Sequence, residues 1–270
     1  MHRSACLIAV VLLVACAAPP PAQEATGPPL PAEVRIDASE LQLFHSERAG
    51  ARYLVSVALP DAPTGRVPAV YVIGEAETFE LVAETSRVLA RGSDARASLV
   101  VGVERDDLQR STDDARLLAF LTDELAPYVA TRYAVSDEKL LVGDRGGAAF
   151  ALYALFTAPR SFAGYLINPG PWPRDDRTLQ REATYAEHEA DLAARVFLAT
   201  GGLDPEAARV EELTRLLRTR HYPQLEIETV IFHGETRSSS VPAALSRGLR
   251  FVLGQRAARD ASNASTSTGE

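Results

Sequence analysis

The residues best placed for chemistry lie in one stretch, residues 140–156, where a short apolar run ends at a glycine-flanked bend and an alanine-rich run follows. A buried strand, a tight turn and an apolar helix, in this order, form a nucleophile elbow. Small residues are needed two positions before and after the centre of such a turn, because strand and helix pass closely there. Gly143 and Gly147 meet this requirement, and the pattern therefore places Arg145 at the centre.

Arg145 cannot perform the chemistry of that position. A nucleophile elbow needs serine, cysteine or aspartate at its centre, because this residue attacks a carbonyl carbon and carries the acyl group. A guanidinium group stays protonated and has no lone pair to offer. The sequence therefore predicts a hydrolase scaffold that has lost its nucleophile.

The elbow and the segment after it resemble a known family. Residues 143–156 read GDRGGAAFALYALF, and residues 165–172 read YLINPGPW. They resemble the esterase D-like and ferric-siderophore esterases, which read Gly-His-Ser-x-Gly-Gly, then an Ala-Leu-Tyr-Ala-Leu helix, then a strand ending in Ser-Pro-x-x-Trp. The resemblance runs from about residue 34 to 254 and places the family serine on Arg145. It implies an α/β-hydrolase fold, with a mostly parallel, doubly wound sheet and an N-terminal antiparallel hairpin.

The resemblance also assigns the other two positions of the catalytic triad. Functional groups gather at the carboxyl ends of strands in such a sheet, and there the triad acid falls on Asp204. Glu206 is the alternative acid, and a plain helix cap at residue 204 is the simpler structural interpretation. The family histidine falls on Arg237. With arginine at two of three positions, the resemblance implies a degenerate triad.

Two further departures concern the surroundings of the elbow. Where the family strand ends in Asp-Gly, close to an amide of the oxyanion hole, this chain has Gly74-Glu75. The loop that begins at residues 104–107 is shorter than the family loop that shapes the substrate cleft. Both differences favour an altered or reduced cleft.

A rival interpretation keeps an active hydrolase with rearranged residues. In it, Asp144 is the nucleophile, and His233 or a serine from residues 238–240 assists. Val142 then stands where a tight turn needs a small residue, which counts against this arrangement. The first interpretation, a catalytically inactive domain kept as a binding or interaction module, has no such conflict.

Two arginines at one site need opposite charge nearby. One solution is a salt-bridged plug, in which carboxylates of the chain itself neutralise both guanidinium groups. The candidates are Asp144, Asp204 and Glu235. The other solution is a bound ligand that carries a carboxylate or phosphate, because helix N-termini favour anions. Its predicted binding residues are Arg145, Gly146, Gly147 and Arg237.

Composition limits the remaining functions. The 270 residues are 46% hydrophobic and 24% charged, which fits one globular domain with a substantial core. A net charge of −8 without a basic patch argues against nucleic acid as a partner. Of the two cysteines, Cys6 leaves with a signal peptide and Cys16 carries lipid, so none remains for a metal site. We expect neither a metal nor a cofactor.

The N-terminus has the features of a bacterial lipoprotein signal peptide over residues 1–15. Its apolar run is too short to span a membrane and ends in LVAC, which resembles the lipobox with Cys16 as the lipidated residue. An ordinary secretory signal cleaved nearby is the alternative. Ala17 in place of aspartate resembles lipoproteins sent to the outer membrane, so we expect an anchor there that faces the periplasm.

The rest of the chain divides into three parts. Residues 16–33 are rich in proline and predict an extended tether, residues 34–254 form the esterase-like domain, and residues 255–270 predict a disordered tail. The expected partners are the membrane, through the lipid, and a small anionic ligand or an envelope protein.

Periodicity predicts the elements around the elbow. Strands are expected at 34–44, 51–59, 67–73, 97–103, 164–167, 194–199 and 225–232, and helices at 77–90, 113–133, 177–192 and 205–220.

Overall fold

The computed structural model describes residues 39–61, 63, 65–105, 113–169 and 177–254. The predicted signal peptide, tether and tail lie outside the described residues, as do Cys16 and Trp172. In the described part of the chain, no helix is both long and apolar enough to cross a membrane.

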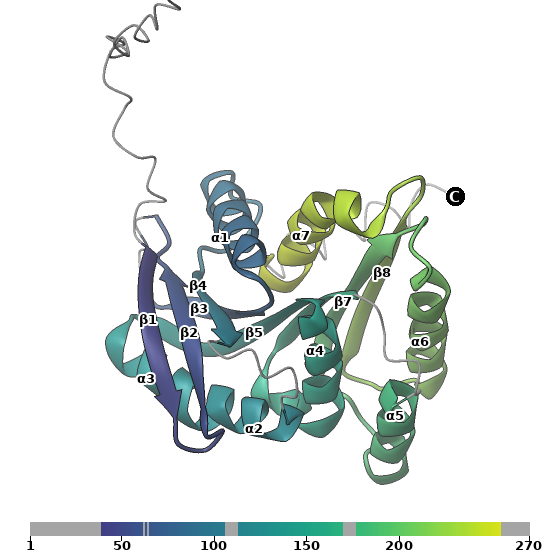
Figure 1. Ribbon diagram of the computed structural model, residues 1–270. Helices are drawn as coiled ribbons and strands as arrows, with labels where there is room; N and C mark the ends of the chain where they lie inside the picture. Colours follow the sequence, from purple (N-terminus) through teal and green to yellow (C-terminus); the bar gives the residue numbers. More distant parts are fainter. Residues whose placement is uncertain (1–38, 62, 64, 106–112, 170–176, 255–270) are drawn as a thin grey trace, which may run out of the picture. The chain divides into compact units, whose positions relative to one another are not determined.

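The described residues form one sheet of eight strands. The strands are β1 Ser39–Ser46, β2 Ala51–Ala58, β3 Val67–Ile73, β4 Leu99–Arg105, β5 Val135–Arg145, β6 Gly164–Pro169, β7 Ala194–Gly201 and β8 Leu225–Phe232. Their order is β1-β2-β4-β3-β5-β6-β7-β8 (Figure 1). Only β2 runs antiparallel to its neighbours, β1 and β4, and the other pairs are parallel. The predicted fold class, a mostly parallel sheet with an antiparallel N-terminal hairpin, is confirmed.

Helices cover both faces of this sheet. They are α1 Ala76–Arg91, α2 Asp114–Ala119, α3 Ala126–Arg132, α4 Gly146–Thr157, α5 Arg177–His188, α6 Ala207–Arg220 and α7 Arg237–Leu253, with a π-helical turn η1 at Phe120–Leu125 and a 3-10 turn η2 at Pro159–Ser161. Helices α1 and α7 pack on one face, and α2 to α6 pack on the other (Figure 1). Because both faces are covered, the central strand β3 is a continuous apolar run, and β5 is apolar and buried over residues 140–142.

The core accordingly has two parts, one on each face. Phe79 and Val82 of α1 join Leu245 of α7 on the first face. Phe120 and Leu155 are buried on the second face. In the segment 113–133, Leu117, Leu121 and Leu125 are buried in the same part of the core as Phe120.

The helix predicted over residues 113–133 differs in one respect, because its middle turn is π-helical. Pro127 stands at the start of the following helix and has no N–H to donate to a carbonyl four residues earlier. A wider turn directly before a proline accommodates this missing bond. Elsewhere, α5 ends at His188, earlier than predicted, and β4 lies two residues further along the chain than predicted.

Candidate functional site

Arg145 ends β5 in a strained conformation and leads directly into α4. Its backbone has φ 50° and ψ −113°, a region that side chains other than glycine rarely adopt. A Cβ added at Gly143 would lie 2.5 Å from the Gly147 carbonyl oxygen, and one added at Gly147 would lie 1.8 Å from that of Ile73. Strand and helix therefore pass as closely as the sequence predicted, with Arg145 at the apex.

This packing predicts that alanine is tolerated at Gly146 but destabilises the protein at Gly147. A Cβ at Gly147 would collide with backbone, whereas one at Gly146 would meet no atom within 4 Å. We expect Gly147→Ala to lower the free energy of unfolding by about 3 kcal/mol, and the matched control Gly146→Ala to stay within about 1 kcal/mol of wild type. Urea unfolding followed by circular dichroism measures both, and equal effects would contradict the close approach.

Asp144 directly precedes the elbow residue Arg145, and its side chain is buried. The residue is 4% exposed. Its Oδ2 accepts a hydrogen bond from Thr78 Oγ1 at 3.0 Å, and its Oδ1 accepts one from Asn168 Nδ2 at 2.8 Å. Both carboxylate oxygens thus accept hydrogen bonds from buried neighbouring side chains.

His233, the proposed assistant of Asp144, is exposed in the turn after β8. Within the described residues, no hydrogen bond or ion pair connects it with Asp144. Ser239 is occupied in the capping box of α7, where its Oγ accepts from the Thr236 backbone N–H at 2.9 Å. Ser240 Oγ donates to the Arg237 carbonyl oxygen at 2.9 Å. In the part of the chain that the structure describes, Asp144, Ser239 and Ser240 thus form hydrogen bonds with other partners and not with one another.

Arg145 is neutralised by a carboxylate that sequence reasoning did not select. Its Nη1 donates a hydrogen bond to Glu75 Oε2 in an ion pair, and its Nε lies 3.9 Å from Asp144 Oδ2. Glu235 was a predicted counter-ion, but its side chain forms no ion pair in the part of the chain that the structure describes. Glu75 is the N-cap residue of α1 and lies two positions after the end of β3. The substitution of the Asp-Gly pair was the only sequence signal for it.

Arg237 forms a bidentate ion pair with Asp204 through two hydrogen bonds. Its Nε donates to Oδ2 at 2.6 Å and its Nη2 donates to Oδ1 at 2.8 Å. The Asp204 side chain is fully buried, whereas that of Arg237 is 25% exposed. The N-cap of α6 is Glu206, and Asp204 lies two residues before it, in the turn that leads into the helix.

Further donors complete the surroundings of Asp204. The Glu206 backbone N–H donates to Oδ1 at 2.9 Å, and Thr200 Oγ1 donates to Oδ2 at 3.2 Å. Burial raises the pKa of this carboxyl, but the hydrogen bonds from Arg237, Glu206 and Thr200 outweigh burial and hold the pKa below its usual value. Asp204 is therefore a charged, fully satisfied group.

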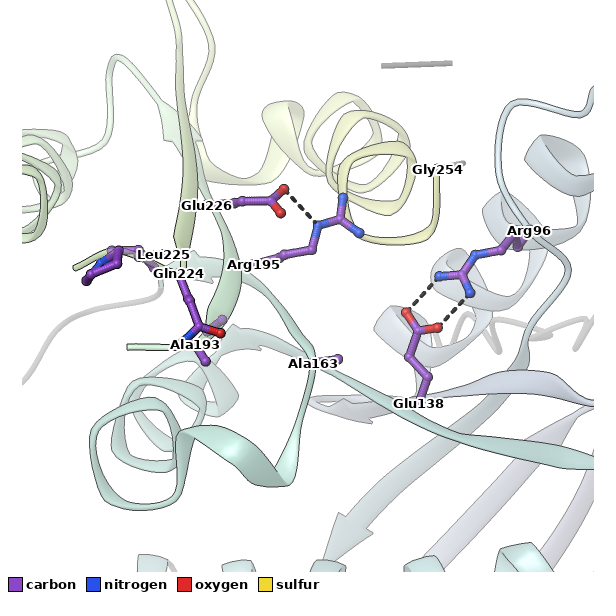
Figure 2. A pocket seen from close by; sticks show the side chains of 11 residues that line it. Arg96, Glu138, Ala163, Ala193, Arg195, Gln224, Leu225, Glu226 and Gly254 are labelled. Carbon is purple, nitrogen blue, oxygen red and sulfur yellow. Dashed lines mark hydrogen bonds and ion pairs between the residues drawn. The ribbon is translucent and has the colours of Figure 1, made fainter. Parts of the chain in front are cut away.

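One cavity among the described residues lies at the amino ends of the strands, at the opposite end of the strands from the elbow. It has a volume of about 730 Å³ and is lined by residues at the amino ends of β6, β7 and β8 and by Gly254 after α7. Figure 2 shows its two ion pairs, which join Arg96 to Glu138 and Arg195 to Glu226. Arg96 and Arg195 also donate to the last carbonyls of α7, those of Leu253 and Val252. These charges therefore anchor the end of a helix.

No group of three or more metal-binding side chains occurs among the residues that the structure describes.

The comparisons with known proteins concern the domain as a whole. A family model described as "Putative esterase" matches residues 46–238. The chain belongs to this esterase family. A search of curated proteins finds no match.

Several solved structures share the fold of this chain. The BES protein from Bacillus cereus has a TM-score of 0.72 at 21% identity, over 84% of this chain and 100% of the other. Siderophore hydrolase EstB from Aspergillus nidulans has a TM-score of 0.68 at 22% identity, over 83% and 97% of the two chains. An IroE-like serine hydrolase from Shewanella oneidensis has a TM-score of 0.68 at 18% identity, over 78% and 79%. At these identities the likeness establishes the α/β-hydrolase fold.

Proposed function

We propose that this protein is a non-hydrolytic member of the esterase family, a binding or interaction module held at the bacterial envelope by a lipid on Cys16. The observation that carries the proposal is the conformation of Arg145, which stands at the apex of an intact elbow with φ 50° and ψ −113°. The scaffold that would present a nucleophile is present, and the side chain that it presents has no lone pair to attack with.

The position of Arg237 supports the same proposal. A triad base must take a proton from the nucleophile and is oriented by the triad acid. Arg237 holds the candidate acid Asp204 in a bidentate ion pair and stays protonated, so it supplies no base. The family positions of the nucleophile and of the base are thus both arginine. The candidate acid Asp204 is buried in an ion pair with one of them.

Ester turnover tests this proposal directly. The measurement is hydrolysis of 4-nitrophenyl acetate by purified protein against a heat-treated sample of the same preparation. The rival function, hydrolysis by Asp144 with His233, needs Asp144 free, and the two hydrogen bonds to its carboxylate speak against it.

Lipidation of Cys16 predicts where the domain is found. Cys16→Ser should abolish labelling by a fatty-acid probe and move the protein from the membrane fraction to the soluble fraction, because a single thiol carries the anchor. Fractionation and metabolic labelling in a bacterial host measure both changes. As a control, Cys6→Ser should leave labelling intact, and membrane retention of the Cys16→Ser protein would rule out the lipid anchor.

A further inference from the structure

The two arginine–carboxylate pairs, Arg145–Glu75 at the elbow and Arg237–Asp204 between the loop after β7 and the start of α7, differ in how exposed they are. Asp204 is fully buried against Arg237, with four hydrogen bonds to its carboxylate. In contrast, the side chains of Arg145 and Glu75 are 46% and 58% exposed. Exposed ion pairs contribute little to stability, so the Glu75 carboxylate is exchangeable whereas Asp204 is not.

Arg145 also has binding capacity to spare. A guanidinium group has five N–H donors in a planar fork that matches a carboxylate. Within the described residues, only Nη1 of Arg145 donates a hydrogen bond, and Asp144 at 3.9 Å from Nε is beyond hydrogen-bond distance. The remaining N–H groups of this half-exposed side chain are available to a ligand.

The space beside Arg145 is open at the backbone as well. A side-chain atom added at Gly146 would meet nothing within 4 Å. The amide of the residue that follows the elbow centre is the one that hydrolases of this fold use to bind an oxyanion. Here a fixed positive charge takes the place of the nucleophile next to that amide.

We propose that the elbow is a receptor for the carboxylate of a small carboxylic acid, which binds Arg145 by replacing Glu75. This inference rests on the proposed function, since it needs a site that does not consume esters. A carboxylate exchanges like for like with the Glu75 side chain and preserves the charge balance. A neutral ester lacks that charge and leaves Glu75 in place, so the site selects the acid over its ester. Arg237 takes no part, because Asp204 holds it.

The test is an NMR titration of the full-length protein with sodium butyrate and with methyl butyrate, followed at the Gly146 and Gly147 amides. We expect saturable shifts with butyrate only. Glu75→Gln removes the internal competitor and should tighten butyrate binding about two- to five-fold, the weight of an exposed ion pair. Arg145→Gln should abolish binding. Arg132→Gln is the matched control, because Arg132 is a half-exposed arginine paired with Glu40 elsewhere, and it should leave binding unchanged.

Several outcomes would overturn the inference: no saturation with wild type and Glu75→Gln alike, equal shifts with the methyl ester, or binding that survives Arg145→Gln. Inorganic phosphate serves as a further probe, and binding of phosphate as tight as that of butyrate would reject the carboxylate class. Release of methanol from methyl butyrate would contradict the proposed function instead. The thermal unfolding of each variant is checked first, and all three substituted side chains are exposed, so we expect folded proteins.

Discussion

Purified protein is expected to hydrolyse 4-nitrophenyl acetate no faster than a heat-treated sample. Loss of one triad member typically removes about four to six decades of rate, and the losses do not add because the members act as a unit. Here arginine occupies two of the three positions that the family resemblance assigns to the triad. Turnover should therefore lie near background across neutral pH.

One variant separates the proposed function from its rival. Asp144→Asn should leave this background rate unchanged, since its carboxylate is buried in hydrogen bonds to Thr78 and Asn168. Turnover in the wild type that Asp144→Asn removes would show that Asp144 is a nucleophile and that the protein is an active hydrolase.

Restoring the family serine and histidine tests whether this fold can still support ester hydrolysis. The double variant Arg145→Ser/Arg237→His puts a hydroxyl at the strained apex and an imidazole beside Asp204, so weak ester turnover is expected. Each single variant should stay at background. Glu75 remains close to the oxyanion position, and Glu75→Gly in addition should raise the rate further, because it removes a negative charge where negative charge develops.

Removal of the Arg237 side chain is expected to destabilise the fold. Arg237→Ala leaves the Asp204 carboxylate fully buried without its bidentate partner, and loss of one member of a buried pair typically costs about 3–5 kcal/mol. Two hydrogen bonds from Thr200 and Glu206 remain, so we expect the lower end, about 3 kcal/mol. Urea unfolding at pH 7 measures this loss.

A double-mutant cycle shows whether the loss of stability in Arg237→Ala comes from its ion pair with Asp204. Asp204→Asn combined with Arg237→Ala should cost less than the sum of the two single changes, because no unpaired charge is left in the interior. As a control for a surface ion pair, Arg48→Ala, whose partner is Asp123, should leave stability unchanged within error. Additive losses at Asp204 and Arg237 would contradict the bidentate contact.

The stability that the Asp204–Arg237 pair contributes should decrease as the pH falls. The pKa of Asp204 is lower in the folded protein than in the unfolded chain, so the unfolded chain binds the proton more readily. The stability from this group is present above the unfolded pKa, about 4, and is lost as pH falls through the folded pKa. The difference between wild type and Arg237→Ala should therefore shrink in acid.

Local patterns in the sequence determined most of the fold. Gly143 and Gly147 around residue 145 fix a close strand–helix crossing, and short apolar runs such as residues 67–73 are typical of strands covered on both faces. The elbow follows from spacing along the chain, and the resemblance to the esterases assigned Arg145 and Arg237 to two triad positions. Both depend on residues a few positions apart, which the sequence displays directly.

Only the tertiary structure decided which carboxylate each arginine meets. Glu75 lies 70 positions before Arg145, and Asp204 lies 33 positions before Arg237. Strands β3 and β5 are neighbours in the sheet although α1 and β4 lie between them in the chain, and this crossover brings the ends of β3 and β5 together. The sequence favoured Glu235 over Glu75, because pairing between distant strand ends depends on the order of strands in the sheet.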